Sequence, residues 1–267
     1  MIDCKKIAEE IKQEIKQEVD KLMVVPLLAI VQVGDNEASN RYVKGKITDC
    51  REVGIIPVLF KLAEDVPEED VLKMIESLNE NDNVTGIIVQ LPLPKHLDEE
   101  KIVQSIVPSK DVDGFTPNSP FTPCTPLGVL TLLDRMGVDV KGKVITLVGY
   151  GKLVNKPLFP ILSDMGATVT VCRRNTKKYD LMRLCRGADI VISAVGRHGI
   201  LNACYFWNPA IVIDCGIDIK DGKQYGDCDE SVHNYIDNVT PRVGGMGLMT
   251  RVALMQNVLK AILEKNK

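Results

Sequence analysis

Lys46 is the residue of this chain whose type and position most strongly suggest chemistry. It lies within residues 36–53, which follow the capping-type residue Asp35 and stop before Gly54, and this pattern predicts a helix. At about 100° per residue, Lys46 falls on the face that carries Ser39, Tyr42, Val43, Cys50 and Val53. A lysine kept from water favours its neutral form and can then accept a proton. The alternative is a lysine whose stem packs while its amine reaches solvent.

A second candidate is the glycine-containing turn Gly149-Tyr150-Gly151. It follows a predicted strand at 143–148 and precedes a helical pattern, which is where a Rossmann-type fold binds the pyrophosphate of a dinucleotide. Val154 stands where the usual G-x-G-x-x-G pattern has its third glycine. The motif alone is also compatible with an ordinary tight turn.

Two arginines, Arg173 and Arg174, follow the next predicted strand, 168–172. An NAD site usually has Asp or Glu at this position to bind the ribose hydroxyls. Arginine can instead bind a phosphate through two parallel hydrogen bonds, so the sequence favours NADP over NAD. The alternative is a solvated basic loop.

The elements that would position these residues alternate between short apolar runs and helix-length segments, which is typical of an α/β protein with parallel sheets. The predicted strands are 27–33, 56–62, 86–91, 143–148, 168–172, 189–194 and 210–214. Further helices are predicted near 68–80, 126–136 and 250–264. The proline-rich stretch 108–126 indicates a connection between domains. We therefore expect an N-terminal α/β catalytic domain (1–119 plus 248–267) and a Rossmann-like parallel-sheet dinucleotide-binding domain (120–247).

Composition narrows the class of protein. The chain has 267 residues, 45% of them hydrophobic, and a formal net charge of −3, which is ordinary for a soluble globular protein. Dispersed basic residues predict neither a nucleic-acid nor a membrane partner. The amphipathic N-terminal segment is not typical of a signal peptide, and we expect a cytoplasmic protein. Eight cysteines and three histidines are scattered, so the sequence predicts reduced thiols and no metal site.

Several strings, read together, resemble the bifunctional methylenetetrahydrofolate dehydrogenase/cyclohydrolase family. They are Tyr42-Val43-Lys44-Gly45-Lys46, Val89-Gln90-Leu91-Pro92-Leu93-Pro94, Lys110-Asp111-Val112-Asp113-Gly114-Phe115, Pro123-Cys124-Thr125-Pro126 and Gly244-Gly245-Met246-Gly247. The likeness extends over nearly the whole chain in the same order. It implies an enzyme of one-carbon metabolism that oxidises methylenetetrahydrofolate with NADP and hydrolyses the methenyl product to formyltetrahydrofolate.

The resemblance also implies roles for individual residues. Lys46 corresponds to the catalytic lysine, and Tyr42 to the aromatic residue that stacks on the reduced folate. Gln90 would hydrogen-bond the lysine, and Asp113 would bind the amino-pyrimidine edge of the pterin. Each has a structural alternative: Tyr42 could fill the core, Gln90 could end a strand, and Asp113 could belong to a turn before Gly114.

For the cofactor, the resemblance implies backbone contacts from Gly149, Tyr150 and Gly151. It also implies a 2′-phosphate contact from Arg174, aided by Arg173, and a nicotinamide-side contact from Ile217. A homodimer and a link to purine biosynthesis are expected from the resemblance only.

The chain departs from the family pattern in the phosphate turn. The family usually has Arg-Ser after the first glycine and a later glycine, where this chain has Tyr150, Gly151 and Asn155. Val243 and Leu248 replace usual prolines, and the segment 116–122 is shorter. Two other functions remain open from the residues: another NADP-dependent dehydrogenase on the same architecture, and a non-catalytic module that senses NADP.

Overall fold

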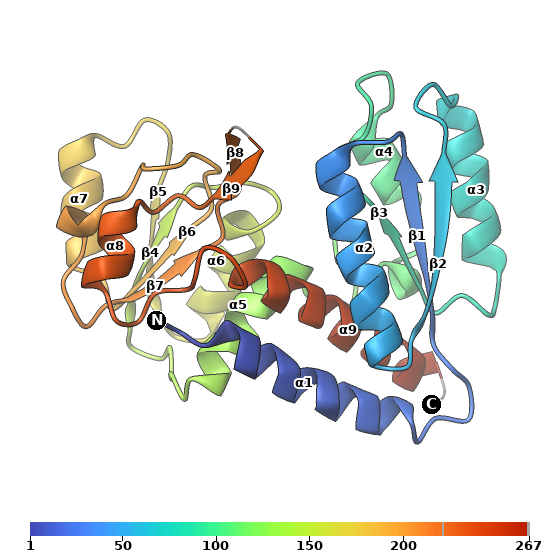
Figure 1. The fold of residues 1–267 in the computed structure, drawn as a ribbon, viewed down its shortest axis with the longest axis horizontal. Helices are drawn as coiled ribbons and strands as arrows, with labels where there is room; N and C mark the ends of the chain where they lie inside the picture. The colour runs from blue at the N-terminus through green and yellow to red at the C-terminus, as the bar shows by residue number, and fades with distance from the viewer. Residues whose placement is uncertain (221, 266–267) are drawn as a thin grey trace. The chain divides into compact units, whose positions relative to one another are not determined.

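The structure, a computed structural model, describes residues 1–220 and 222–265. Contacts between residues divide the chain into two compact units (Figure 1). Unit 1 comprises Met1–Ala8 and Thr125–Thr250, and unit 2 comprises Glu9–Cys124 and Arg251–Lys267. The domain limits expected from the sequence, at 119/120 and 247/248, remain a prediction.

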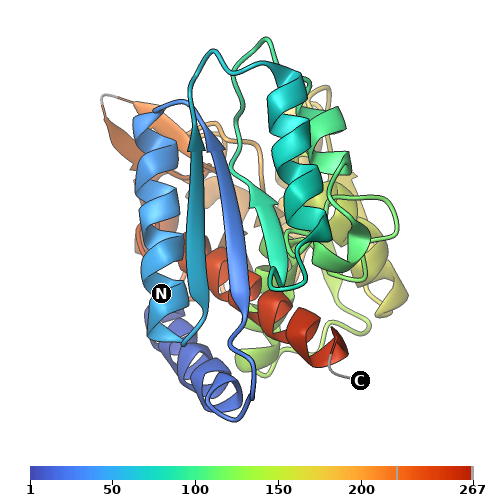
Figure 2. The same cartoon turned by 90° about the vertical axis from the view of Figure 1, so that its right-hand side faces the viewer.

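Unit 2 is built on a parallel sheet with the strand order β2-β1-β3. The strands are β1 (Leu27–Val33), β2 (Ile56–Leu62) and β3 (Gly86–Val89), and the helices that lie wholly within the unit are α2 (Glu37–Glu52), α3 (Glu68–Glu80) and α4 (Glu99–Gln104), with a short 3-10 helix η1 (Pro108–Lys110). Figure 2 shows the three strands running in one direction between α2 and α3. Nearly all of β1 and all of β3 are buried, because helices cover both faces of a parallel sheet.

Unit 1 has a second parallel sheet, with the strand order β5-β4-β6-β7. Its elements are β4 (Val144–Val148), α6 (Asn155–Asp164), β5 (Thr168–Cys172), α7 (Lys178–Arg186), β6 (Ile190–Ser193), η2 (Ala203–Tyr205), β7 (Ile211–Asp214), the antiparallel pair β8 (Asp218–Lys220) and β9 (Lys223–Tyr225), and α8 (Glu230–Tyr235). Strands β4 and β6 are buried along most of their length, and β7 is buried in its middle. This is the arrangement of a Rossmann-type half domain, in which ligands bind beyond the carboxyl ends of the strands.

Three helices cross the unit limits in sequence: α1 (Cys4–Val19), α5 (Cys124–Arg135) and α9 (Met246–Lys265). The last of these was predicted to begin at residue 250. It begins at Met246 instead, and Gly247, which the sequence grouped with the glycine turn, is part of the helix. The sequence also predicted the helix after the proline-rich stretch from residue 126, whereas α5 starts at Cys124. Pro126 is accommodated there because the first turn of a helix does not need the N–H that proline lacks.

The β8–β9 hairpin and the helices α4, α7 and α8 were not predicted from the sequence. The hairpin strands, α4 and α8 are too short to give a clear period. The predicted parallel α/β architecture is confirmed in both units.

Candidate functional site

Lys46 is buried on α2, with 6% of its surface exposed. Asn36 begins the helix as its N-cap, since its side-chain oxygen accepts hydrogen bonds from the N–H groups of Ala38 and Ser39. The Lys46 amine donates a hydrogen bond to Gln90 Oε1 at 3.1 Å. The alternative, a lysine whose stem packs while its amine reaches solvent, does not agree with this degree of burial.

Gln90 directly follows β3 and is held at both ends of its amide. Its Nε2 donates to the carbonyl of Leu91 at 2.7 Å, while its Oε1 accepts from Lys46. Its backbone N–H continues the pairing with β1 by donating to Val31 at 2.8 Å. The amide is therefore fixed with its oxygen towards the lysine.

Tyr42 lies one helical turn before Lys46 on the same face of α2. The lysine Nζ is 5.1 Å from the centre of the tyrosine ring, a cation–π distance. The ring is partly buried and leaves part of its surface for contact with another molecule. The structure thus brings Tyr42, Lys46 and Gln90 together.

Asp113 lies in the segment that runs beside β3, where Asp111 forms a parallel bridge with Ile87. Burial raises the pKa of the Asp113 carboxyl, while the Lys46 charge and a hydrogen bond from Cys124 lower it. This coupling places Asp113 within electrostatic reach of the lysine. We call Tyr42, Lys46, Gln90 and Asp113 the lysine cluster.

Sequence reasoning missed three residues that hold this segment. Asp111 is fully buried and accepts hydrogen bonds from the N–H groups of Gly114 and Thr116, at 3.0 and 2.7 Å. Asn257, on α9, donates to the carbonyls of Val112 and Thr122, both at 2.9 Å.

The third missed residue is Cys124, whose buried thiol donates a hydrogen bond to the carbonyl of Val112 at 3.4 Å and also lowers the pKa of the Asp113 carboxyl. Burial, with the negative charge of Asp113, raises the pKa of this thiol well above its usual range, which keeps it protonated. In the sequence, Asn257 was marked only as a polar residue inside an apolar helical pattern, whereas Asp111 and Cys124 lie in strings that carry the family resemblance.

A buried ion-pair group fixes α2 beneath the lysine. Asp49 is one turn after Lys46, is 3% exposed, and pairs with Lys12 Nζ at 2.7 Å and Arg251 Nε at 2.6 Å. Gly45 makes room for this arginine, since a Cβ at position 45 would collide with its guanidinium. Removing one partner from such a group leaves an uncompensated buried charge.

In unit 1, the glycine turn follows β4 as predicted. Gly149 has φ +91°, and a Cβ there would lie 2.6 Å from the carbonyl oxygen of Ala194, so only glycine fits. Apart from its chain neighbours, no described residue has an atom within 4 Å of a Cβ built on Gly151, so the turn is open on that side. The helix α6 begins at Asn155 with no side-chain cap hydrogen bond at Val154.

Asn155 replaces the later glycine of the family's phosphate turn and is fully buried. Its Nδ2 donates to the carbonyls of Val148 and Gly149 at 2.9 and 3.1 Å, which ties the turn to the end of β4. Its Oδ1 is buried without a partner among the described residues. The side chain therefore supports the turn from behind.

Arg173 and Arg174 are both exposed after β5. The Arg173 guanidinium lies 4.3 Å from the centre of the Tyr150 ring, and that ring packs edge-on against Phe159 at 6.4 Å. A cation is thus held at the turn although Tyr150 replaces the usual arginine. A glycine cradle, an uncapped helix start and two arginines fit a phosphate-bearing dinucleotide.

Ile217, the predicted nicotinamide-side residue, follows β7 and is 52% exposed. Its carbonyl oxygen would lie 3.2 Å from a Cβ at Gly196, so the loops after β6 and β7 touch. All predicted cofactor residues of unit 1 therefore stand beyond the carboxyl ends of its parallel strands.

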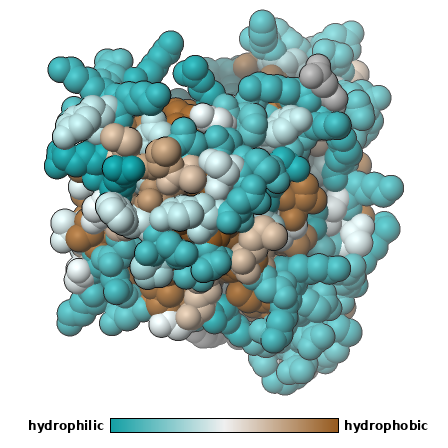
Figure 3. Space-filling view, turned by 60° about the vertical axis from the view of Figure 1, so that its left-hand side comes forward, coloured by the Kyte–Doolittle hydropathy of each residue, from teal (hydrophilic) through white to brown (hydrophobic). Residues whose placement is uncertain are grey.

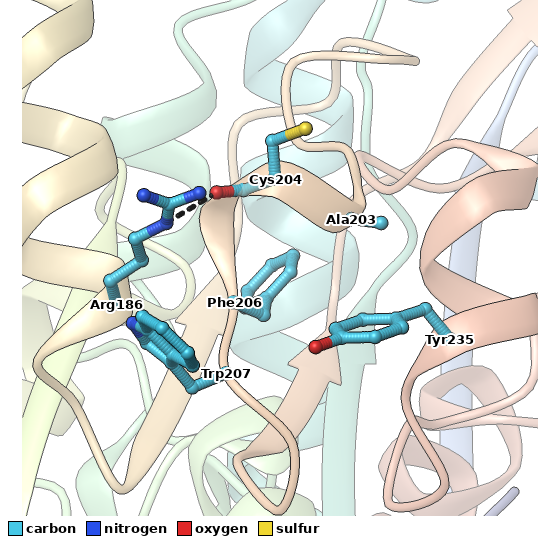
Figure 4. A pocket seen from close by; sticks show the side chains of 6 residues that line it. All are labelled: Arg186, Ala203, Cys204, Phe206, Trp207 and Tyr235. Carbon is cyan, nitrogen blue, oxygen red and sulfur yellow. Dashed lines mark hydrogen bonds between the residues drawn. The ribbon is translucent and has the colours of Figure 1, made fainter.

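A separate cavity of about 270 Å³ lies in the same unit, near residues that precede β6 and β7. Figure 4 shows the Trp207 and Tyr235 side chains at this cavity and the hydrogen bond from Arg186 to the carbonyl of Cys204. Because the amino and carboxyl ends of parallel strands lie at opposite edges of a sheet, the cavity is not part of the glycine turn. It is lined by Arg186, Ala203, Cys204, Phe206, Trp207 and Tyr235.

On the face drawn in Figure 3, hydrophobic side chains form small patches separated by hydrophilic ones. Within residues 1–220 and 222–265, no helix is long and apolar enough to cross a membrane. In the same described ranges, no group of three His, Cys, Asp or Glu side chains could hold a metal ion. The cysteines are free, and six of the eight are buried.

The fold and the two sites define a class: an α/β protein with a Rossmann-type nucleotide-binding unit and a lysine-containing polar cluster on a second parallel sheet. Residues 2–113 match the family described as tetrahydrofolate dehydrogenase/cyclohydrolase, catalytic domain, and residues 123–266 match its NAD(P)-binding domain. The chain belongs to the tetrahydrofolate dehydrogenase/cyclohydrolase family.

Individual relatives agree. The chain is 42% identical to the bifunctional protein FolD of Agathobacter rectalis, over 98% of each chain. It superposes with a TM-score of 0.94 on FolD of Campylobacter jejuni, at 39% identity and over 99% and 98% of the two chains. The same TM-score, at 29% identity and over 100% and 98% of the two chains, relates it to the Trypanosoma brucei enzyme complexed with NADP and an inhibitor.

Proposed function

We propose that this protein oxidises methylenetetrahydrofolate with NADP and hydrolyses the methenyl product, with the lysine cluster acting on the folate. The reaction pair is that of its family, and the chain is an enzyme of tetrahydrofolate one-carbon metabolism. The observation that carries the residue assignment is the burial of Lys46 against Gln90 at 3.1 Å. A buried amine held by a neutral amide is suited to exchanging a proton with a substrate-bound water.

Substrate binding is assigned to Asp113 and Tyr42. A carboxylate can accept the paired N–H groups on the amino-pyrimidine edge of a pterin, as it accepts those of a guanidinium. Asp111, Cys124 and Asn257 support this role, because they hold the segment that carries Asp113. The partly buried Tyr42 ring offers a flat surface on which the pterin can stack.

The hydrolytic step is assigned to Lys46. Water loses a proton to the lysine amine as its oxygen bonds to the methenyl carbon. One carbon–nitrogen bond of the bridge then breaks, the protonated lysine returns the proton to the leaving nitrogen, and the remaining hydroxyl proton passes to solvent as the formyl carbonyl forms. Gln90 orients the amine through its Oε1 and leaves the amine's other positions for water and substrate. The ring nitrogens of the folate stabilise the methenyl cation, so the oxidation step depends more on orientation than on a base.

The cofactor is NADP, which accepts the hydride when bound. We assign the pyrophosphate to the Gly149-Tyr150-Gly151 backbone and the start of α6, and the nicotinamide side to Ile217. Arg174, aided by Arg173, would bind the 2′-phosphate. The stacking of Arg173 on Tyr150 supports this assignment, since it keeps a cation beside the turn without the family's usual arginine.

We also propose that the enzyme is a cytoplasmic homodimer whose product serves purine biosynthesis, as the resemblance implies, and that it has no nucleic-acid partner. The net charge of −3 supports the last point, because binding to nucleic acid rests mainly on basic side chains. Light scattering on the purified protein at several concentrations tests the dimer: a monomer mass throughout would reject it.

The experiment for the assignment measures both activities in Lys46→Met. NADPH formation from methylenetetrahydrofolate reports the dehydrogenase, and the decay of supplied methenyltetrahydrofolate reports the cyclohydrolase. We expect the cyclohydrolase to be abolished while dehydrogenase activity remains measurable. Lys44→Met, on the exposed side of the same helix, is the matched control and should keep both activities.

Equal loss of both activities in a folded Lys46→Met variant would contradict the assigned role. Absence of folate-dependent NADPH formation in the unaltered protein would reject the dehydrogenase itself and favour a module that only binds NADP.

A further inference from the structure

A buried carboxylate, Asp227, lies beyond the carboxyl ends of β6 and β7 and has no role in the assignments above. It is 0% exposed. Its Oδ2 accepts hydrogen bonds from Ser193 Oγ at 2.6 Å and from the N–H of Val195 at 2.8 Å, and its Oδ1 accepts from the N–H of Arg197 at 2.8 Å. One side chain thus fixes the loop that follows β6.

A second carboxylate, Asp214, repeats the arrangement at the end of β7. It accepts hydrogen bonds from the N–H groups of Gly216, Asp227 and Cys228, at 2.9, 3.0 and 2.8 Å. Burial raises the pKa of Asp214, with its backbone hydrogen bonds opposing that change. Asp214 therefore holds the backbone that carries Asp227.

Two glycines, Gly216 and Gly226, complete a reciprocal contact between the two segments that carry these carboxylates. A Cβ at Gly216 would overlap the Asp227 carboxylate, and a Cβ at Gly226 would overlap that of Asp214. Each carboxylate is packed against backbone, so neither can shift without moving the opposite loop.

The loop held by Asp227 borders the candidate cofactor residues. A Cβ at Gly149 would lie 2.6 Å from the carbonyl oxygen of Ala194 and 3.2 Å from Cγ2 of Val195. On the other side, Gly196 approaches the carbonyl of Ile217. The position of this loop therefore sets the space between the glycine turn and the nicotinamide-side residue.

We propose that Asp227 is a positioning residue that shapes the nicotinamide half of the cofactor site through Val195, Arg197 and Gly216. This inference rests on the assignment of Ile217 to the nicotinamide side. Three hydrogen-bond donors converge on the Asp227 carboxylate, two at Oδ2 and one at Oδ1. Both oxygens must therefore act as acceptors. An asparagine would turn an NH₂ group towards at least one of these donors and release part of the loop.

The test measures dissociation constants for NADP and for 2′,5′-ADP, which carries the adenosine half alone, in two variants. Asp227→Asn removes the charge and one acceptor, whereas Gly216→Ala keeps the carboxylate but displaces it. We expect NADP to bind about tenfold more weakly or worse in both, which corresponds to the loss of one hydrogen bond to a charged group. Binding of 2′,5′-ADP and cyclohydrolase activity with supplied methenyltetrahydrofolate should stay within about twofold.

Gly187→Ala is the control, because its Cβ would make only an ordinary contact of 3.5 Å with the Arg183 carbonyl. It should match the unaltered protein in every measurement. Unchanged NADP binding in Asp227→Asn would overturn the proposal. So would an equal weakening of NADP and 2′,5′-ADP, or a parallel loss of cyclohydrolase, since each would indicate a general structural defect.

Amide hydrogen exchange separates this inference from the proposed function. In Asp227→Asn the amides of Val195 and Arg197 should exchange faster, while amides of β4 should not change. This readout holds whether or not the protein oxidises folate. If the unaltered protein lacks dehydrogenase activity, the proposed function fails; if the two amides keep their protection, the positioning role fails.

Discussion

The lysine cluster of unit 2 and the cofactor turn of unit 1 each adjoin a parallel sheet but are built differently. In the lysine cluster, buried side chains hold one another, as Lys46 and Gln90 do at 3.1 Å. At the turn, the backbone around Gly149 makes the shape, and exposed arginines supply the charge.

The difference follows from what each site has to do. A group that exchanges a proton must be kept from bulk water and held in one geometry, because its interactions are stronger where the dielectric is low. A phosphate is already strongly charged and can be bound at the surface by N–H groups and flexible cations. A single substitution should therefore cause a large loss of activity at the lysine cluster and a smaller loss of cofactor affinity at the turn.

Gln90→Leu tests the large loss of activity expected at the lysine cluster. The leucine removes the acceptor at the lysine amine without adding a charge, so the amine is no longer oriented. We expect the cyclohydrolase rate to fall by about 100-fold, within the range for a disturbed acid–base group. The assay is hydrolysis of supplied methenyltetrahydrofolate.

Gln104→Leu, on the exposed surface of α4, is the matched control and should keep the wild-type rate. A Gln90→Leu variant as fast as the control would mean that the amide merely ends a strand.

Arg174→Ala tests the smaller loss of NADP affinity expected at the cofactor turn. Losing one charge-assisted contact should weaken NADP by about 10- to 100-fold and leave NAD within a few-fold. Titrations with both nucleotides measure the ratio. Arg183→Ala, an exposed arginine on α7, should not change it. Unaltered discrimination in Arg174→Ala would move the 2′-phosphate site elsewhere.

Tyr150→Leu should have a smaller effect on the same ratio. It removes the ring on which Arg173 lies at 4.3 Å, a contact worth about 0.5–1 kcal/mol at an exposed site, or a few-fold in NADP affinity. In a double-mutant cycle with Arg173→Ala the effects should not add. Additive effects would show that the ring and the guanidinium act independently.

The smallest of the expected effects is a change in the pH dependence of stability in Asp113→Asn. Burial raises the folded-state pKa of this carboxyl above its unfolded value, so the folded protein binds the proton more tightly. The contribution of Asp113 to stability therefore decreases as pH rises from the unfolded to the folded pKa. The asparagine side chain does not titrate, so the variant lacks this decrease. The free energy of unfolding of the variant minus that of the wild type should therefore increase as pH rises between the two pKa values.

Denaturant titrations of both proteins at several pH values measure this difference. A difference that stays constant or shrinks as pH rises would contradict the stated burial effect on Asp113.

The sequence was sufficient for the parts of the fold whose pattern is local. The helix around Lys46 and the strands of both sheets follow from periodicity, and Gly149 follows from the strand before it. The side-chain stack of Arg173 on Tyr150 could not be predicted, because these residues come from different strand ends that meet only after folding.

The supporting residues were missed for the same reason. Asn257 reaches the backbone around Asp113 from the last helix of the chain, and Asp227 reaches Val195 across a hairpin that the sequence did not reveal. In each case the function of the side chain depends on a partner far away in sequence. The periodic pattern identifies which face is buried, but not which polar group it meets.

The most direct test of the account replaces the buried amine with a cation that cannot accept a proton. In Lys46→Arg, hydrolysis of supplied methenyltetrahydrofolate should fall by about 100- to 10,000-fold, because proton transfer is lost although the charge remains, and Lys46→Met is expected to lose this activity as well. If Lys46→Arg hydrolyses the substrate at close to the wild-type rate while Lys46→Met does not, position 46 acts through its positive charge and the proton-transfer role is wrong.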